Sequence, residues 1–273
     1  MLNNIFRQRT ISMTNRPIRQ MMISGYYGFH NLGDELILKV LVQQLRLIEA
    51  GAEEAYQLVV LSQEPNITEA TYQVQAIQRL NLFQIMKALV KTEIFVSGGG
   101  GLLQDKTGFG SVVYYGGLIL LAKLFGKRVV IWNQGVGPLS RSFSRLFANW
   151  VFRFSDLIML RDTKSAELVK SLTGQECLVT ADPVWLLDKP SLEKDLEYDG
   201  HIRIGVSLRQ WPDLTDERLR SFGENLIDYA KELKEKRKEE VSFLLLAFQE
   251  QQDSHVLAFL ASLFRGQGFE AQL

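Results

Sequence analysis

The residues best suited to chemistry lie in short loops that combine glycine with polar or aromatic side chains. The first loop, GYYGFHNLGDE, runs from Gly25 to Glu35 between a short apolar run and a helical pattern. Its glycines permit close approach of a ligand, and Glu35 could serve as a general base toward a hydroxyl group. The alternative is a capped helix after a turn, since acids suit the positive end of a helix dipole. We expect ligand contacts from Tyr26, Phe29, His30 and Asn31.

A second loop, SGGGGLLQDKTGFGS, follows a buried apolar run and occupies Ser97 to Ser111. Consecutive glycines cost backbone entropy, which is often offset by amides that face an anion. The loop lacks the Gly-Lys-Ser/Thr ending of a phosphate-binding P-loop, and Leu103 interrupts the dinucleotide fingerprint. The alternative is a tight turn without a ligand. The predicted ligand-binding residues here are Gly98, Gly99, Gly100, Gly101, Gln104 and Asp105.

Two arginines follow predicted strands, at positions suited to binding an anion. Arg161 lies in LRDTKS, where its guanidinium could bind a carboxylate or phosphate or simply pair with Asp162. Arg209 lies in GVSLRQW at the start of a second unit, where we expect it to face the first unit. Asp182, in TADPVWLL, ends another strand and is a further predicted substrate contact. The loop Asn133–Arg141, NQGVGPLSR, suits a turn and a site equally. Together these loops predict an interdomain cleft that binds an anionic ligand and a polar partner.

The elements that must position these loops alternate between short apolar runs and helical patterns from residue 21 to residue 187. This alternation predicts an α/β fold, a Rossmann-like doubly wound parallel sheet with helices on both faces. Residues 188–200 are polar and charged and are typical of a linker. Residues 201–273 offer two more strands and two more helices, so we expect a second, incomplete Rossmann-like domain. The alternative is that these elements extend the first sheet.

Composition narrows the class of protein. The 273 residues have a formal net charge of zero, which argues against nucleic-acid binding by bulk electrostatics. One cysteine, Cys177, and three histidines leave no basis for a disulfide framework, a cysteine zinc site or a multi-histidine metal centre. We therefore expect a cytoplasmic protein without a metal.

Neither residues 1–20 nor the apolar runs of the chain have the pattern of a secretory signal or of a membrane-spanning helix. Residues 1–20 contain four arginines and no acid, and no apolar segment follows them. We predict a disordered basic tail; a weak attraction of this tail to anionic membrane is the alternative. The longest apolar stretch, Val112–Phe125, contains Lys123 and is too short to span a bilayer.

Taken in order, the segments SGYYGFHNLGDELIL, SGGGGLLQD, GVGPL, RDTKSAELV, DPVWLL and SLRQW resemble the polysaccharide pyruvyl transferase family, in particular its CsaB-like branch. The resemblance runs from about Met22 to about Phe248. It implies two Rossmann-like domains of the GT-B glycosyltransferase type. It also implies transfer of an enolpyruvyl-derived group from phosphoenolpyruvate to a sugar of a cell-surface polysaccharide, giving a pyruvate ketal. The CsaB-like branch acts on N-acetylmannosamine of secondary cell wall polymers, and its product anchors S-layer proteins.

The resemblance assigns roles to particular residues. It implies that Arg161 and Arg209 clamp the donor and that Glu35 acts as base or sugar-binding group. The glycines of Gly98–Gly101 would supply amide donors. No cofactor is implied, because phosphoenolpyruvate is itself the donor substrate. The implied acceptor is a lipid-linked or polymeric saccharide, which would bring the enzyme to the inner membrane face. A homo-oligomer is compatible with the pattern.

One departure from the family pattern matters for activity. The pattern continues to an Arg-Leu-His segment that this chain, ending at Leu273, does not contain. We therefore expect that the 273-residue chain is truncated and that its activity could be lost. Two other functions stay open: a nucleotide-sugar glycosyltransferase of the same architecture, and a binding remnant without catalysis.

Overall fold

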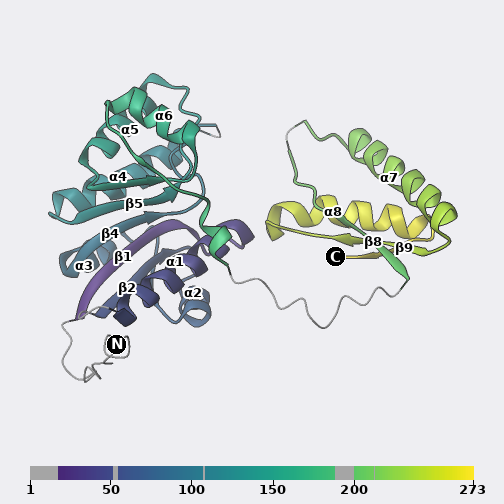
Figure 1. The fold of residues 1–273 in the computed structure, drawn as a ribbon, viewed down its shortest axis with the longest axis horizontal. Helices are drawn as coiled ribbons and strands as arrows, with labels where there is room; N and C mark the ends of the chain where they lie inside the picture. The colour runs from purple at the N-terminus through teal and green to yellow at the C-terminus, as the bar shows by residue number, and fades with distance from the viewer. Residues whose placement is uncertain (1–17, 52–54, 107, 188–199, 212) are drawn as a thin grey trace, which may run out of the picture. The chain divides into compact units, whose positions relative to one another are not determined.

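The computed structural model describes residues 18–51, 55–106, 108–187, 200–211 and 213–273. These residues form two compact units (Figure 1). The first unit comprises Ile37–Pro183 and the described residues up to Tyr26, and the second comprises Tyr27–Leu36 and Val184–Leu273. Most of the predicted linker, residues 188–199, and of the predicted tail, residues 1–17, lies outside the described residues.

The first unit is built on a seven-stranded sheet in the order β3-β2-β1-β4-β5-β6-β7. The strands are β1 (Ile18–Tyr27), β2 (Ala55–Ser62), β3 (Gln75–Gln78), β4 (Thr92–Gly98), β5 (Arg128–Gln134), β6 (Leu157–Leu160) and β7 (Leu178–Val179). β4 pairs in parallel with both β1 and β5, and β6 continues the parallel ladder to β7. The predicted doubly wound α/β fold is confirmed. Its strand order reverses between β1 and β4, the position where open α/β sheets bind ligands.

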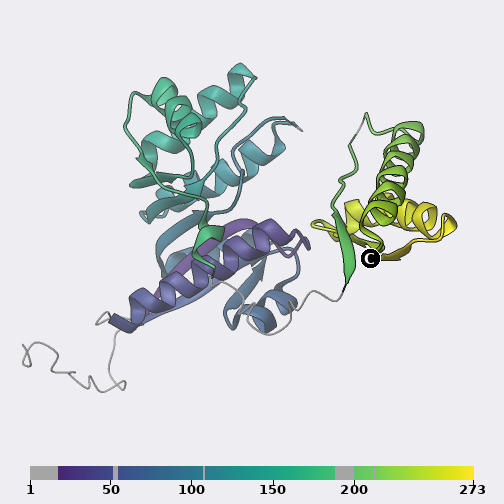
Figure 2. The same ribbon diagram turned by 45° about the vertical axis from the view of Figure 1, so that its right-hand side comes forward.

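Helices cover both faces of this sheet (Figures 1 and 2). They are α1 (Leu32–Gly51), α2 (Pro65–Tyr72), α3 (Leu82–Lys91), α4 (Gly110–Leu124), α5 (Ser142–Phe154) and α6 (Thr163–Thr173), followed by the short 3-10 helix η2 (Pro183–Leu186). α1 begins in the second unit and continues in the first. Strand residues such as Met22, Phe95 and Ile131 are fully buried, as expected for strands covered on two faces.

β1 begins at Ile18, three residues before the predicted strand, so the prediction that the tail extends to residue 20 is wrong. The cause is a polar residue that the apolar pattern does not reveal. The side chain of Gln20 is buried, and its Nε2 donates to the Ala88 carbonyl oxygen and to Thr92 Oγ1, each at 2.9 Å. A buried amide is tolerated where both its hydrogen bonds are made.

The second unit has its own three-stranded parallel sheet in the order β10-β9-β8. Its elements are β8 (His201–Val206), α7 (Asp216–Arg237), β9 (Glu240–Leu245), α8 (Glu250–Gly266) and β10 (Glu270–Gln272). The sheet is separate from the seven-stranded one, so the alternative of one extended sheet is wrong. The core of this unit centres on Phe243, whose ring stacks on Phe264 with centroids 3.9 Å apart.

Candidate functional site at the carboxyl edge of the sheet

The glycine-rich loop after β4 lies along the loop that follows β5. The amide nitrogen of Gly135 donates to the Gly100 carbonyl oxygen at 2.8 Å, and that of Gly137 donates to Leu103 at 2.9 Å. Leu103 is fully buried and fixes this loop in the core. Gly101 is exposed, and a Cβ built on it would meet no atom within 4 Å. The loop is therefore held on both sides of Gly101, at Gly100 and at Leu103, and is open at Gly101 itself, which suits a backbone that receives a ligand.

Two amide side chains lie buried where β5 ends. Gln134 Nε2 donates to the carbonyl oxygen of Ser97 at 2.7 Å and to Ser97 Oγ at 2.8 Å, which fixes the orientation of the amide. Gln134 Oε1 and Asn133 Oδ1 are buried and have no hydrogen-bond partner among the described residues. Buried acceptors without partners are costly, so they favour a hydroxyl or water donor at this edge. Sequence reasoning named the loop but missed these side chains; the signal was a pair of amides directly before Gly135.

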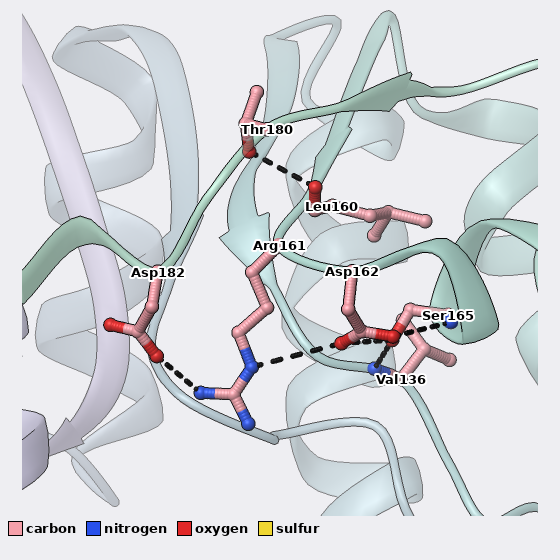
Figure 3. Close-up of polar contacts among 7 residues, drawn as sticks. All are labelled: Val136, Leu160, Arg161, Asp162, Ser165, Thr180 and Asp182. Carbon is pink, nitrogen blue, oxygen red and sulfur yellow. Dashed lines mark hydrogen bonds and ion pairs between the residues drawn. The ribbon is translucent and has the colours of Figure 1, made fainter. Parts of the chain in front are cut away.

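Arg161 follows β6 at the same edge of the sheet (Figure 3). Its Nη1 lies 2.8 Å from Asp182 Oδ2, and its Nε lies 3.9 Å from Asp162 Oδ2. About a third of the Arg161 side chain, 34%, is exposed. A Cβ built on Gly135 would lie 2.8 Å from Arg161 Nε, so the guanidinium can take this place only beside a glycine. The structure thus brings together two predicted site residues, Arg161 and Asp182. They lie next to the loop after β5, whose Gly135 amide donates to Gly100.

Asp162 is the N-cap of α6, and its carboxylate accepts hydrogen bonds from α6 in addition to its ion pair with Arg161. Asp162 Oδ1 accepts from the Ser165 amide at 2.8 Å, and Oδ2 accepts from Ser165 Oγ at 2.9 Å. Ser165 Oγ in turn accepts from the Val136 amide at 2.8 Å, which links α6 to the loop after β5 (Figure 3). This N-cap fixes one of the two carboxylates beside Arg161.

Asp105 and Gln104 serve the local backbone. Asp105 is 4% exposed, and its two carboxylate oxygens accept from the amides of Ser140 at 2.8 Å and Arg141 at 2.9 Å. The Ser140 amide first, and then the Arg141 amide, hold the pKa of Asp105 below its usual range, because both stabilise the ionised form. Gln104 Oε1 accepts from the Lys106 amide at 2.9 Å. Asp105 therefore fixes the backbone that leads into α5. Its predicted substrate contact stays a prediction beside this structural role.

The predicted loop residues around Glu35 lie mainly in the second unit. Glu35 Oε1 accepts from the Gly28 amide at 2.8 Å, and Asn31 Oδ1 accepts from the Asp34 amide at 3.2 Å. The structural alternative, a helix start that is held by its own side chains, is thus present in the loop. Tyr26, Phe29 and His30 are half-buried, and Tyr26 packs on the core of the first unit.

Arg209 contacts glutamine side chains of α8 and of the residue before it. Its guanidinium donates to Gln249 Oε1, and to Gln252 Oε1 at 3.1 Å. Gln249 also forms an isolated antiparallel bridge with Asn31 within the second unit. Arg209 is thus oriented by neutral amides, which leave its positive charge uncompensated by these two partners.

Neither a metal cluster nor a membrane span is found in the parts of the chain that the structure describes. Residues 18–51, 55–106, 108–187, 200–211 and 213–273 contain no group of three or more His, Cys, Asp or Glu placed to hold a metal ion. None of the helices in these ranges is long and apolar enough to cross a membrane.

Solved structures define the class of this fold. A protein assigned as a UDP-N-acetylglucosamine 2-epimerase from Listeria monocytogenes superposes with a TM-score of 0.53 at 10% identity, over 93% of this chain and 70% of that one. UDP-GlcNAc 2-epimerase from Methanocaldococcus jannaschii, solved with UDP-GlcNAc and UDP, gives a TM-score of 0.51 at 12% identity, over 93% and 73%. The chain is therefore an α/β protein of the GT-B-like class, with parallel Rossmann-like sheets.

Comparison with family models assigns the chain to one family within this fold class. The model of the polysaccharide pyruvyl transferase family matches residues 31–269, nearly the whole chain, so the protein belongs to this family of transferases. The resemblance noted in the sequence motifs is confirmed, and with it the prediction of an enzyme. No curated protein sequence matches the chain significantly.

Proposed function

We propose that this transferase takes a pyruvyl group from phosphoenolpyruvate and forms a ketal on a sugar of a cell-surface polysaccharide, with N-acetylmannosamine as the acceptor sugar. The observation that carries the proposal is the placement of Arg161. Its guanidinium is oriented by two carboxylates at the carboxyl edge of the sheet, is partly exposed, and lies beside the loop that holds Gly100.

Phosphoenolpyruvate carries a carboxylate and a phosphate, and both need donors. A guanidinium binds such groups through two parallel N–H bonds, and exposed backbone amides of a glycine-rich loop bind a second anionic group. Asp182 and Asp162 hold Arg161 in one orientation, which lowers the entropy lost on binding but also offsets part of its charge. Arg209, which contacts neutral amides, is proposed as the second cation.

The proposed reaction has three steps. A proton adds to the methylene carbon of phosphoenolpyruvate and leaves an oxocarbenium-like centre at the neighbouring carbon. A sugar hydroxyl attacks this centre and loses its proton to a base, for which we propose Glu35. A second hydroxyl then attacks the same carbon as phosphate leaves, and its proton goes to the departing phosphate, so that one donor and one diol give one ketal and one phosphate. Positive charge near the phosphate stabilises its departure.

Ligand-dependent thermal stabilisation tests the donor. A ligand that binds only the folded state raises the free energy of unfolding, by about 2.7 kcal/mol at a concentration 100-fold above Kd. We expect phosphoenolpyruvate to raise Tm, and Arg161→Ala to abolish the rise. Gly135→Ala should weaken it as well, because the new Cβ displaces the guanidinium. Arg128→Ala is the matched control, since Arg128 begins β5 at the opposite edge of the same sheet.

The outcomes separate the competing functions. If phosphoenolpyruvate raises the Tm of Arg161→Ala as much as that of the unmodified chain, the proposal that Arg161 binds the donor is rejected. A rise with UDP-sugars alone would favour a nucleotide-sugar glycosyltransferase. A rise with phosphoenolpyruvate but no release of phosphate on addition of acceptor would favour a binding protein.

A further inference from the structure

One helix of the first unit presents a continuous apolar stripe to solvent. On α5, Phe143, Leu146, Trp150 and Phe154 are 57%, 55%, 52% and 55% exposed. Spacings of three and four residues place these side chains on one helix face. Ala148, Val151 and Phe152 on the opposite face are fully buried in the core. The core therefore does not use the exposed stripe, and a contiguous apolar stripe, unlike scattered apolar residues, marks an interaction surface.

Aromatic rings widen the stripe beyond α5. Phe109, 53% exposed and directly before α4, packs edge-on against Phe143 with ring centroids 6.4 Å apart. Phe143 also stacks on Phe147 of the next turn at 6.0 Å. We call this surface, formed by Phe109, Phe143, Leu146, Trp150 and Phe154, the α5 face.

All charged side chains of α5 are positive. Within Ser142–Phe154 the charged residues are Arg145 and Arg153, and Arg141 directly precedes them. The Arg141 guanidinium lies 5.9 Å from the centre of the Phe109 ring, so one arginine borders the apolar surface directly. Arg153 is oriented by hydrogen bonds to Asn149 and to the Thr173 carbonyl oxygen and keeps its charge.

A helix with Trp, Phe and Leu on one face and arginines beside them has the composition of helices that lie in the interface of an anionic bilayer. Aromatic rings favour the headgroup level, and arginines favour anionic phosphates. A contact between two copies through α5 is disfavoured, because Ser142–Phe154 contains no acid that could pair with Arg145 or Arg153 of a second copy.

We propose that the α5 face docks the first unit onto an anionic lipid surface, with its apolar side chains at the boundary between headgroups and acyl chains. This inference does not rest on the identity of the donor or of the acceptor sugar.

Vesicle co-sedimentation of the full chain tests the proposal. We expect binding to vesicles of phosphatidylglycerol and phosphatidylcholine, weaker binding at high salt, and little binding to phosphatidylcholine alone. Trp150→Ser with Phe154→Ser should weaken binding at least tenfold. Arg141→Gln with Arg145→Gln should weaken it about fivefold for each arginine, and only on anionic vesicles.

The control variant is Leu47→Ser with Ile48→Ser on α1, which removes two apolar side chains that are 67% and 64% exposed. We expect this control to bind like the unmodified chain. The basic residues 1–17 are present in every variant, so a difference between variants reports on the α5 face and not on the tail. Because all the changed side chains are exposed, unchanged melting curves will show that the variants are folded.

Three results would overturn the proposal. The first is an unmodified chain that does not bind anionic vesicles. The second is binding that is equal in the α5 variants and in the α1 control. The third is a stable dimer in light scattering that Trp150→Ser with Phe154→Ser dissociates, without any vesicle binding, since the α5 face would then be a contact between copies.

Discussion

At the scale of single residues, the ionisation of Asp105 is tied to the folded backbone. The amides of Ser140 and Arg141 lower its folded pKa below that of the unfolded chain. A carboxylate with a lowered folded pKa stabilises the fold above its unfolded pKa, and this stabilisation is lost as pH falls through the folded pKa. The stability of the first unit should therefore decline from about pH 4 downward.

Replacement of this carboxylate tests the assignment. In Asp105→Asn one of the two backbone amides faces an NH₂ group instead of an acceptor, so we expect a lower Tm at pH 7. The difference from the unmodified chain should shrink as pH falls through the folded pKa of Asp105, because the unmodified chain then loses the same charge. Thermal melts between pH 2 and pH 7 measure both effects, and Asp228→Asn on the exposed surface of α7 is the control. A difference in Tm that is independent of pH would contradict the role of the charge.

At the scale of elements, α4 and α5 approach closely at a glycine. A Cβ built on Gly116 would lie 2.6 Å from Phe147 Cε1 and 2.9 Å from Val151 Cγ2. Gly116→Ala should therefore destabilise the first unit by about 1–3 kcal/mol, because the extra methyl overpacks the interface.

The neighbouring Gly117 is the matched control for this close approach. A Cβ at Gly117 meets no atom within 4 Å, and alanine has a higher helix propensity than glycine. Gly117→Ala should then stabilise the unit by about 0.5–1 kcal/mol. Denaturant unfolding of both variants measures the pair. Equal effects of the two substitutions would show that α4 and α5 adjust without cost.

The elements also show what the sequence pattern could predict. Continuous apolar runs predicted β4 and β5, since strands covered on both faces must be apolar along their length. β10 (Glu270–Gln272) was missed, because only Ala271 of its three residues is buried. α2 was missed although Pro65 suits a first helical turn.

The candidate site was predicted less completely than the fold. Loops that follow strands are visible in sequence, so the place of Arg161 was predictable. The partner of its guanidinium, Asp182, is 21 residues away, and the amides that hold Asp105 are 35 and 36 residues away. Such pairs depend on tertiary placement, which neither periodicity nor composition reports. The same limit hid Gln134, whose partner Ser97 lies on the neighbouring strand.

At the scale of the whole molecule, each of the two units has a hydrophobic core of its own. Buried residues of the first core, such as Phe95, and of the second, such as Phe243, belong to separate clusters on separate sheets. A unit with its own core can unfold by itself. We therefore expect two transitions in calorimetry rather than one.

Substitutions in the two cores should separate these transitions. Phe243 is 1% exposed and contacts Phe264 and Phe269, so Phe243→Ala should cost about 3–5 kcal/mol and lower only the transition of the second unit. Phe95→Ala, at a fully buried position of the first sheet, is the reciprocal variant and should lower only the other transition. If either substitution moves both transitions by the same amount, the two cores unfold as one cooperative unit. Addition of phosphoenolpyruvate to both variants then shows which transition the donor stabilises. Arg161 predicts a rise in the transition of the first unit, and Arg209 predicts a rise in that of the second unit as well.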